Sequence, residues 1–476
     1  MTEFEQQYLA LCRDELGETR YPMTKDMNMT QLVARIEESG QRIAQALLKS
    51  RLAEDPRSDP PQPVCRQCQG KLRIQEHAQR RALNTAIGEI EYMRAYGVCD
   101  RCGHTAAPLD EALGIPSFGP SVEVLQKISH AAVTARSFEM AAEILREHSS
   151  IELSAKQVRV SSESEGKRVA GIRQREVELF RKGKKILGPG IVADLIVVTA
   201  DGGRIQTRQS DKDAEGGEWK EDKVGAIYDA SPRKDPAARD AEEYDGAKSR
   251  TKTFAATMQS WEEFGGMLCV EAYKRGYVEA KEKLFISDGA QSLRTFRQTH
   301  FPEATFILDW YHAVEHLSGC AKAAFGEGSD ECAAWYRRVK TKLWMGDLDG
   351  VIRAIEKEAK RVGKPQPKEP SSSPRVILDR DIGYFNENRK GMDYPCFRVE
   401  GWPIGSGVAE GAVKQFGMRL KGSEKFWNGF GLGLGAEEML ALCALHRSED
   451  GRWRDYWDRR ARPLSWEAKQ EADHES

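Results

Sequence analysis

The strongest chemical signal in the sequence is a set of four cysteines arranged in two pairs. Cys65 and Cys68 form the first Cys-X-X-Cys pair, and Cys99 and Cys102, which precede Gly103, form the second. Zn²⁺ favours four soft ligands in a tetrahedron, and two such pairs supply them without a large apolar core. We therefore predict a structural Zn²⁺ bound by the four thiolates, while redox chemistry at a Cys-X-X-Cys pair is the weaker alternative.

A second set of candidate residues consists of carboxylates that follow short apolar runs. Asp288 follows the run Leu284–Ser287, Asp309 follows the run Thr305–Leu308, and each aspartate precedes a predicted helix. Apolar runs rich in β-forming residues predict buried strands, and their alternation with helices predicts that they are parallel. Side chains at the carboxyl ends of such strands lie where α/β folds bind ligands, although a lone aspartate there is more often only a helix cap.

Two further acids complete this set. Asp201 follows the β-branched run at residues 191–200, and Glu410 lies on a predicted helix opened by the Gly-Ser-Gly turn at residues 405–407. Phosphodiester cleavage needs little beyond two divalent cations about 3.5–4 Å apart, and Mg²⁺ takes hard oxygen ligands such as carboxylates. We predict Asp201, Asp288 and Glu410 as the catalytic acids and as ligands of two Mg²⁺ or Mn²⁺ ions.

Asp309 is the alternative to Asp288 as the second acid, because it also ends a predicted strand. We favour Asp288, since the adjacent Gly289 leaves room for a phosphate, whereas the bulky Trp310 and Tyr311 follow Asp309. An Asp309 that only caps a helix would be needed for folding rather than for the reaction.

Basic, imidazole and aromatic side chains near these acids are candidates for DNA contacts. His312 and His316 are spaced i, i+4 and could bind a metal ion, but the acids already account for metal binding. We interpret the two histidines as orienting their helix or contacting DNA. Lys414 lies one turn after Glu410 on the same helix face. The DNA-binding candidates are His312, His316, Lys414, Arg419, Lys421 and Trp427.

The elements that position the cysteines are predicted to be strands of a zinc ribbon. Residues 71–77 and 87–98 alternate polar and apolar side chains. The two cysteine pairs are further apart than the common spacing of about 15–20 residues, so this ribbon must carry an extended hairpin. Residues 137–149 and 154–171 predict two amphipathic helices, which form either a helix-turn-helix or an ordinary helical hairpin.

The elements that position the predicted catalytic acids are expected to form a mixed sheet. Residues 191–208 predict a strand, a turn at Gly202–Gly203 and a returning strand, and residues 219–230 predict a third strand before a polar loop that runs to about Lys252. A helix at residues 262–276 and the two parallel strands follow. This pattern predicts an α/β fold: a ribonuclease H-like mixed five-stranded sheet with a helical insertion, preceded by a zinc ribbon and a helical DNA-binding region.

Composition and length favour a globular protein with several domains. The 476 residues are 31% charged and 40% hydrophobic, with a net charge of −2 and basic clusters at 181–185, 414–425 and 452–462. No apolar run reaches the roughly 18 residues of a membrane span, and the acidic N-terminus does not resemble a signal peptide, so we expect a cytoplasmic protein. The predicted segments are an N-terminal helical region (1–58), the zinc ribbon (59–108), the helical DNA-binding region (109–186), the first part of the core (187–317), the helical insertion (318–398), the last part of the core (399–450) and a C-terminal tail (451–476).

Four segments of the sequence resemble bacterial insertion-sequence transposases of the DDE superfamily, specifically the ISKra-type group. They are FISDGA, FPEATFILDWYHAVEHL, GWPIGSGVAEGAVKQFGMRLKG and GAEEMLALCALHR. The resemblance implies a ribonuclease H-like core, a triad of Asp201, Asp288 and Glu410, dependence on Mg²⁺, and cut or copy chemistry on the ends of an element in a bacterial cell. The segment KGSEKFW departs from the family pattern, which has Met-Arg-Trp here, although Trp427 is retained.

The leading hypothesis is therefore a transposase that acts on double-stranded DNA as a homodimer or higher oligomer at the nucleoid. One alternative is a structure-selective nuclease on the same fold, which would need the acids but no strand transfer. Another is a domesticated DNA-binding protein that uses only its zinc ribbon and helical region. The presence of all three predicted acids argues against the non-enzymatic alternative.

Overall fold

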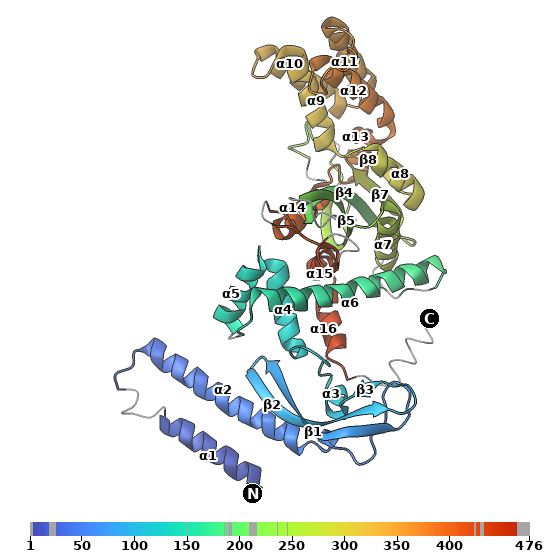
Figure 1. Cartoon of the computed structure of the whole chain (residues 1–476). Coiled ribbons are helices and arrows are strands. Elements are labelled where there is room, and N and C mark those ends of the chain that lie inside the picture. The colour runs from blue at the N-terminus through green and yellow to red at the C-terminus, as the bar shows by residue number, and fades with distance from the viewer. Residues whose placement is uncertain are drawn as a thin grey trace. The chain divides into compact units, whose positions relative to one another are not determined.

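A computed structural model shows that the chain forms two compact units (Figure 1). It describes residues 3–18, 25–149, 151–184, 186, 188, 193–208, 217–235, 237–244, 246–422, 425–428 and 433–463. Met1–Ser162 and Trp453–Ser476 form the first unit, and Glu163–Arg452 form the second. None of the helices within these ranges has both the length and the apolar character required to cross a lipid bilayer.

The first unit is built on a long β-hairpin. Its strands β1 and β2 pair antiparallel from Leu72 opposite Cys99 to Thr85 opposite Gly88, as the alternating pattern predicted. The length of the hairpin explains the wide separation of the two cysteine pairs, because its open end brings them together. The elements of this unit are α1 (Glu3–Glu18), α2 (Met29–Glu54), η1 (Pro56–Ser58), β1 (Leu72–Thr85), β2 (Gly88–Cys99), β3 (Thr105–Ala106), α3 (Pro108–Leu113), α4 (Val122–Thr134) and α5 (Phe138–Ser149).

Two small apolar clusters stabilise the hairpin at different places along its length. Leu83, Ile90 and Tyr92 pack with Leu52 of α2, which lies along the hairpin in Figure 1. Leu72 packs with the cysteines and Ala106 at the open end. The helix α6 (Ala155–Arg181) begins in the first unit and ends in the second, and α16 (Arg452–Arg460) also spans the boundary between them. Ser154 caps the start of α6, since the N–H of Gln157 donates to Ser154 Oγ at 3.3 Å.

The second unit contains a five-stranded mixed sheet with the order β6-β5-β4-β7-β8. The strand β5 is antiparallel to both β4 and β6, whereas β7 is parallel to both β4 and β8. The bounds of the strands are β4 (Leu195–Arg208), β5 (Gly217–Ser231), β6 (Lys248–Thr257), β7 (Glu282–Ser287) and β8 (Thr305–Leu308). The predicted strands before Asp288 and Asp309 and their parallel pairing are confirmed.

Helices cover both faces of this sheet, and this explains why its central strands are apolar runs. On one face Ile196, Val198 and Phe285 pack with Phe264 and Leu268 of α7. On the other face the alternate residues of the same strands pack against α9 and the helices after it. The helices are α7 (Trp261–Lys274), α8 (Gln291–His300), α9 (Trp310–Phe325), α10 (Asp330–Trp344), α11 (Leu348–Val362), α12 (Pro374–Glu387), η2 (Arg389–Gly391), α13 (Tyr394–Glu400), α14 (Gly407–Leu420) and α15 (Ala436–Arg447).

The predicted turn at Gly202–Gly203 is wrong. Both glycines lie inside β4, where they pair with Lys223 and Asp222 of β5. The glycines are needed for a close approach, because a Cβ at Gly203 would lie 2.6 Å from Asp222 Oδ1. The third antiparallel strand is instead β6, which begins inside the segment predicted as a polar loop. Only its second half, Thr253–Thr257, is an uninterrupted buried run.

Candidate functional site

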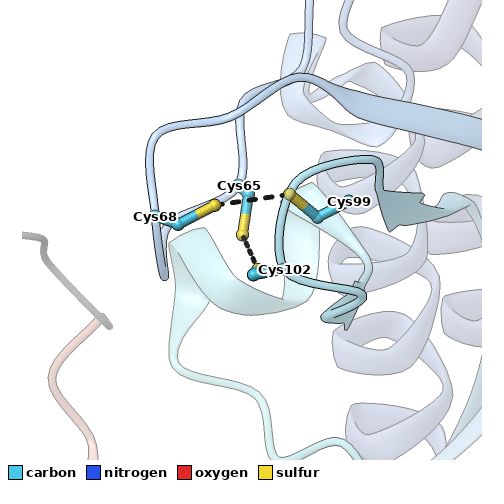
Figure 2. A group of neighbouring side chains, drawn as sticks. All are labelled: Cys65, Cys68, Cys99 and Cys102. Carbon is cyan, nitrogen blue, oxygen red and sulfur yellow. Dashed lines mark hydrogen bonds between the residues drawn. The ribbon is translucent and has the colours of Figure 1, made fainter.

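The four predicted cysteines meet at the open end of the β1–β2 hairpin (Figure 2). Their four sulfur atoms all lie within 4.8 Å of one another. The Sγ atoms of Cys65 and Cys102 are 3.7 Å apart, and those of Cys68 and Cys99 are 3.4 Å apart. Four Zn–S bonds of about 2.3 Å in a tetrahedron require sulfur–sulfur distances of about 3.8 Å. The four cysteines can therefore hold a zinc ion with little rearrangement.

The sulfur atoms lie on two turns that have the same backbone hydrogen bonding. The N–H of Gln67 donates to Cys65 Sγ at 3.3 Å, and the N–H of Arg101 donates to Cys99 Sγ at 3.4 Å. Each turn closes with a left-handed residue four positions after its first cysteine, Gln69 with φ of 59° and Gly103 with φ of 70°. The backbone donors stabilise negative charge on sulfur, as metal-bound thiolates require.

The protonation properties of the thiols also favour a bound cation. Backbone N–H donors, first that of Cys102, lower the pKa of Cys99 to about 6. The N–H of His104 acts in the same direction on Cys102, but burial and the neighbouring thiols raise the pKa of Cys102 to about 12. The thiolate of Cys99 is thus stabilised, whereas ionisation of Cys65 and Cys102 is opposed, so four thiolates need a cation to balance them. The nearby His104 and His77 pair instead with Glu111 and Asp59.

The sheet of the second unit brings the predicted acids to the carboxyl ends of its parallel strands. Thr199 of β4 pairs with Ile286 of β7, so Asp201 and Asp288 each follow the same pair by two residues. Asp201 was predicted to lie at the end of its strand, but it lies in the middle of β4. It lies where the parallel ladder with β7 has ended and only the antiparallel ladder with β5 continues.

The surroundings of Asp201 show that the three predicted acids interact. Burial raises the pKa of Asp201, and the charges of Asp288 and Glu410 raise it further. The N–H of Gly202, which donates to Asp201 Oδ1 at 2.7 Å, and the imidazole of His312 act in the opposite direction. A mutually repelling set of carboxylates is the usual ligand chemistry of divalent cations.

These acids do not form a closed ligand set. Among the described residues, the cysteines are the one group of three or more metal-ligating side chains whose donor atoms converge. The carboxylate oxygens of Asp201, Asp288 and Glu410 are hard ligands of the type that Mg²⁺ takes, but they do not converge as the four thiols do. This open arrangement differs from the compact cluster of the four thiols.

Glu410 lies in the first turn of α14 and faces His312 of α9. Its Oε1 is 3.6 Å from His312 Nε2, and its Oε2 is 3.8 Å from Lys414 Nζ. Ser406 Oγ donates to the same Oε1 at 3.4 Å. Lys414 is 79% exposed, so Glu410 has a histidine on its inner side and an exposed cation on its outer side.

Asp309 differs from the other acids, because it is fully buried and its oxygens accept backbone hydrogen bonds. Its Oδ1 accepts from the N–H groups of Tyr311 at 2.6 Å and His312 at 3.0 Å, which makes it the cap of α9. Its Oδ2 accepts from the N–H of Ser406, just before α14. These contacts leave Asp309 in a structural position and favour Asp288 as the acid available for chemistry.

Gly289 has a different role from the one expected. Its φ is +78°, and an added Cβ would lie 2.4 Å from Leu308 Cδ1 and 2.9 Å from Asn388 Oδ1. The glycine is therefore required by the turn and by close packing, and it does not leave open space for a phosphate. The side chain of Asp288 is fixed by this turn, since its Oδ1 accepts from the N–H of Ala290 at 2.9 Å.

Several predicted DNA-contact residues are engaged in contacts within the protein. His316 Nδ1 is 3.0 Å from Asp381 Oδ1, and its ring stacks on Tyr384 with the centroids 3.8 Å apart. Arg419 and Trp427 are only 2% and 7% exposed, and the guanidinium lies over the indole ring at 5.1 Å. These contacts indicate that His316, Arg419 and Trp427 stabilise the fold.

Trp427 also joins the chain after α14 to β4. Its indole N–H donates to Leu420 O at 2.8 Å, and its backbone pairs with β4 around Thr207. Lys421 lies near the buried Asp222, whose pKa it lowers against the larger effect of burial. The departure from the family pattern falls at residues 421–427, of which Ser423 and Glu424 lie outside the described residues.

Asp222 of β5 is the residue near this site that the sequence did not reveal. It is 2% exposed and pairs with Gly203, two residues after Asp201 on the same face of the sheet. Burial raises its pKa, and the charge of Asp201 contributes to the same effect. An acid two residues before the apolar residue Val224 was a visible signal, but its relation to Asp201 depends on the strand register.

Comparison with known proteins gives a family but no characterised relative. Residues 23–456 match the profile of an uncharacterised protein family (UPF0236). No curated protein matches the chain. The match covers both the cysteine cluster and the acids, so one family contains the two candidate sites in a single chain.

Proposed function

We propose that this chain, which belongs to the uncharacterised protein family UPF0236, is a DNA transposase. It would hydrolyse a phosphodiester bond at each end of a mobile element and release a 3′-hydroxyl group. The oxygen of that hydroxyl would then attack a phosphate of target DNA, with the target's own 3′-oxygen leaving. The observation that carries the proposal is that Asp201 and Asp288 each follow one paired position of β4 and β7 by two residues, with Glu410 near enough for its charge to raise the pKa of Asp201.

The topology of the second unit supports the proposal. Three antiparallel strands followed by two parallel strands, in the order β6-β5-β4-β7-β8, are the arrangement expected of a ribonuclease H-like core. The proposed acids follow this order, with Asp201 in the first strand, Asp288 directly after the fourth and Glu410 on a later helix. Ligands of open α/β sheets bind at the carboxyl ends of strands, which is where these acids lie.

The proposal gives the three acids unequal roles. Asp201 is central because it interacts with both other acids, and Asp288 and Glu410 each complete one side of the site. Divalent cations held there would activate the nucleophile and stabilise the leaving oxygen. His312 holds the carboxylate of Glu410 from the inner side, and the exposed Lys414 is placed to contact a DNA phosphate.

We assign the first unit to recognition of the element ends. In this proposal Cys65, Cys68, Cys99 and Cys102 bind one Zn²⁺ and make the open end of the β1–β2 hairpin a zinc ribbon. The helices α5 and α6 then present basic side chains to the DNA backbone, in the manner of a helix-turn-helix. Binding through phosphate contacts is steeply dependent on salt concentration. Assembly of two or more copies on DNA would bring both ends of an element together.

The test is cleavage of a labelled duplex that carries the genomic DNA flanking the gene, with Mg²⁺ or Mn²⁺ present. The variants Asp201→Ala, Asp288→Ala and Glu410→Ala should each abolish cleavage and leave DNA binding unchanged or slightly tighter, because negative charge near the phosphates is removed. The matched control is Asp194→Ala, which removes an exposed carboxylate that pairs with Lys281 beyond the amino end of β4. It should cleave like the wild type.

A second readout separates the transposase from its alternatives. Incubation with a supercoiled target plasmid should give products joined to the labelled element end. Cleavage without joined products would favour a structure-selective nuclease. Binding of the DNA with neither reaction, by wild type and variants alike, would favour a DNA-binding protein and contradict the proposal.

A further inference from the structure

A buried aspartate beside the acidic site has an unpaired oxygen. Asp222 lies on β5 opposite Gly203 of β4, and cross-strand partners point to the same face of a sheet. Since Asp201 and Gly203 are two residues apart, their positions also share that face. The missing side chain at Gly203 leaves the space that the Asp222 carboxylate occupies.

The charge of Asp222 is not neutralised by a direct contact. Its Oδ1 is buried without a hydrogen-bond partner, and within the described part of the chain no ion pair of 4.0 Å or shorter involves its carboxylate. Lys421 and Lys223 act on it only as neighbouring charges, and Lys223 Nζ is engaged with Glu221 at 3.1 Å. A buried carboxylate in this position is costly unless a cation or a hydrogen-bond donor balances it.

Two other buried aspartates of this unit have a direct cationic partner. Asp229, on the same strand, accepts hydrogen bonds from Arg275 and from the N–H of Thr251. Asp381 contacts His316 and Arg380. Asp222 therefore differs from Asp229 and Asp381 in having no direct cationic partner, and it lies close to Asp201.

We propose that Asp222 is a positioning residue of the acidic site, whose buried negative charge is balanced by the divalent cation that Asp201 binds. This inference rests on the cation-binding part of the proposed function. Asp222 would act through Asp201, by strengthening the attraction for the cation and by fixing the position of the β4 backbone at Gly203. Partners of metal ligands in such positions commonly change metal affinity by about 10–100-fold.

The test compares Asp222→Asn with Asp229→Asn in the full-length protein, with equimolar Zn²⁺ present so that the thiols do not compete. Binding of Mn²⁺ is followed by the electron paramagnetic resonance signal of the free ion, without DNA. Asp222→Asn should weaken Mn²⁺ binding about tenfold, and Asp229→Asn should leave it unchanged. In the cleavage assay, the Mn²⁺ concentration for half-maximal rate should rise by a similar factor, while the maximal rate falls less.

Thermal unfolding in the presence of a magnesium chelator gives an independent readout. Asp222→Asn should raise the melting temperature, because it removes an uncompensated buried charge, whereas Asp229→Asn should lower it by leaving Arg275 unpaired. If Asp222→Asn does not fold, Asp222→Ala replaces it in both measurements. Unchanged Mn²⁺ affinity in the folded variant would overturn the inference. A wild type that binds Mn²⁺ more tightly than Asp222→Asn but never cleaves DNA would contradict the transposase proposal alone.

Discussion

Asp309 and Ser406, which are 97 residues apart in the chain, are joined by a hydrogen bond from the N–H of Ser406 to Asp309 Oδ2. The other oxygen of the same carboxylate caps α9. One buried side chain therefore fixes both the start of the helical segment after β8 and the start of α14, which carries Glu410. The position of Glu410 relative to the sheet depends on this connection.

Replacement of Asp309 should consequently damage folding before it affects chemistry. Asp309→Ala removes three backbone hydrogen bonds to a buried carboxylate and should lower the free energy of unfolding by about 3 kcal/mol. Asp309→Asn retains one acceptor and should lose less. Urea denaturation followed by circular dichroism measures both changes. An Asp309→Ala protein of unchanged stability without cleavage activity would instead identify Asp309 as the second catalytic acid.

Shortening the side chain of Glu410 should change the choice of metal. Glu410→Asp moves the carboxylate back toward α14, and Mg²⁺ requires near-ideal octahedral geometry. Weak cleavage should therefore survive with Mn²⁺, which tolerates looser geometry, and be absent with Mg²⁺. The assay is end cleavage at matched metal concentrations. Equal activity with both metals would show that Glu410 does not contribute a metal ligand.

The cysteine cluster should bind one Zn²⁺ per chain. Because metal-ligating thiols must lose their protons, binding should release protons and weaken at low pH. Metal analysis of the purified protein should give one equivalent of zinc, lost in Cys99→Ser and kept in Cys332→Ser, whose thiol lies outside the cluster. Stoichiometric zinc in Cys99→Ser would contradict the assignment.

The two cysteine turns have different residues, Gln69 and Gly103, at equivalent left-handed positions, so each residue type can be tested at the other position. Gln69 adopts a left-handed conformation that costs a non-glycine residue roughly 1 kcal/mol, and the equivalent position in the second turn is Gly103. Gln69→Gly should stabilise the zinc-bound protein by about 0.5–1 kcal/mol. Gly103→Gln should destabilise it by a similar amount, since a Cβ at Gly103 meets nothing within 4 Å. Equal melting temperatures for all three proteins would contradict this.

Acid should weaken the second unit through Glu271 of α7. Burial alone would raise the pKa of Glu271, but its paired contacts with Arg452 at 2.9 and 2.8 Å and the charge of Lys274 lower it to about 2. A lowered pKa means that the carboxylate contributes stability above its ordinary value of 4.5 and loses that contribution as pH falls toward 2. The difference corresponds to about 3 kcal/mol.

Glu271→Gln should therefore destabilise the protein by about 3 kcal/mol at pH 7, and the difference from wild type should shrink between pH 4.5 and pH 2. Urea denaturation at pH 7, 4 and 3 measures this change. The control is Glu262→Gln, which removes an exposed carboxylate of the same helix. A constant difference between wild type and Glu271→Gln at all three pH values would exclude this role.

The predictions from sequence succeeded where short-range signals dominate. The apolar runs before Asp288 and Asp309 are buried strands because both faces of the sheet are covered, so continuous hydrophobicity was a reliable signal. The alternating segments between the cysteine pairs form the β1–β2 hairpin for a similarly local reason. The spacing of the cysteines also predicted their convergence, since two short turns at the open end of one hairpin must face each other.

The predictions failed where a distant segment decides the role of a residue. Gly202 and Gly203 have the composition of a turn, but the Asp222 side chain occupies the space that a Cβ at Gly203 would need. Arg419 and Trp427 were predicted to contact DNA, and their burial depends on contacts that the sequence does not show, such as the pairing of Trp427 with Thr207 of β4. Asp222 could be connected with Asp201 only through the register of β4 and β5.

The β1–β2 hairpin has two apolar clusters that share no residues, one at the cysteines and one beneath α2. Between them the strand pairing shifts twice, at Ile74/Glu76 and at Glu76/Gln79. We therefore expect each cluster to open independently of the other within one pair of strands. Removal of zinc should increase amide hydrogen exchange near Cys65 and Cys99 and leave the amides around Leu83 and Ile90 protected. A bound metal would then order one end of the hairpin only.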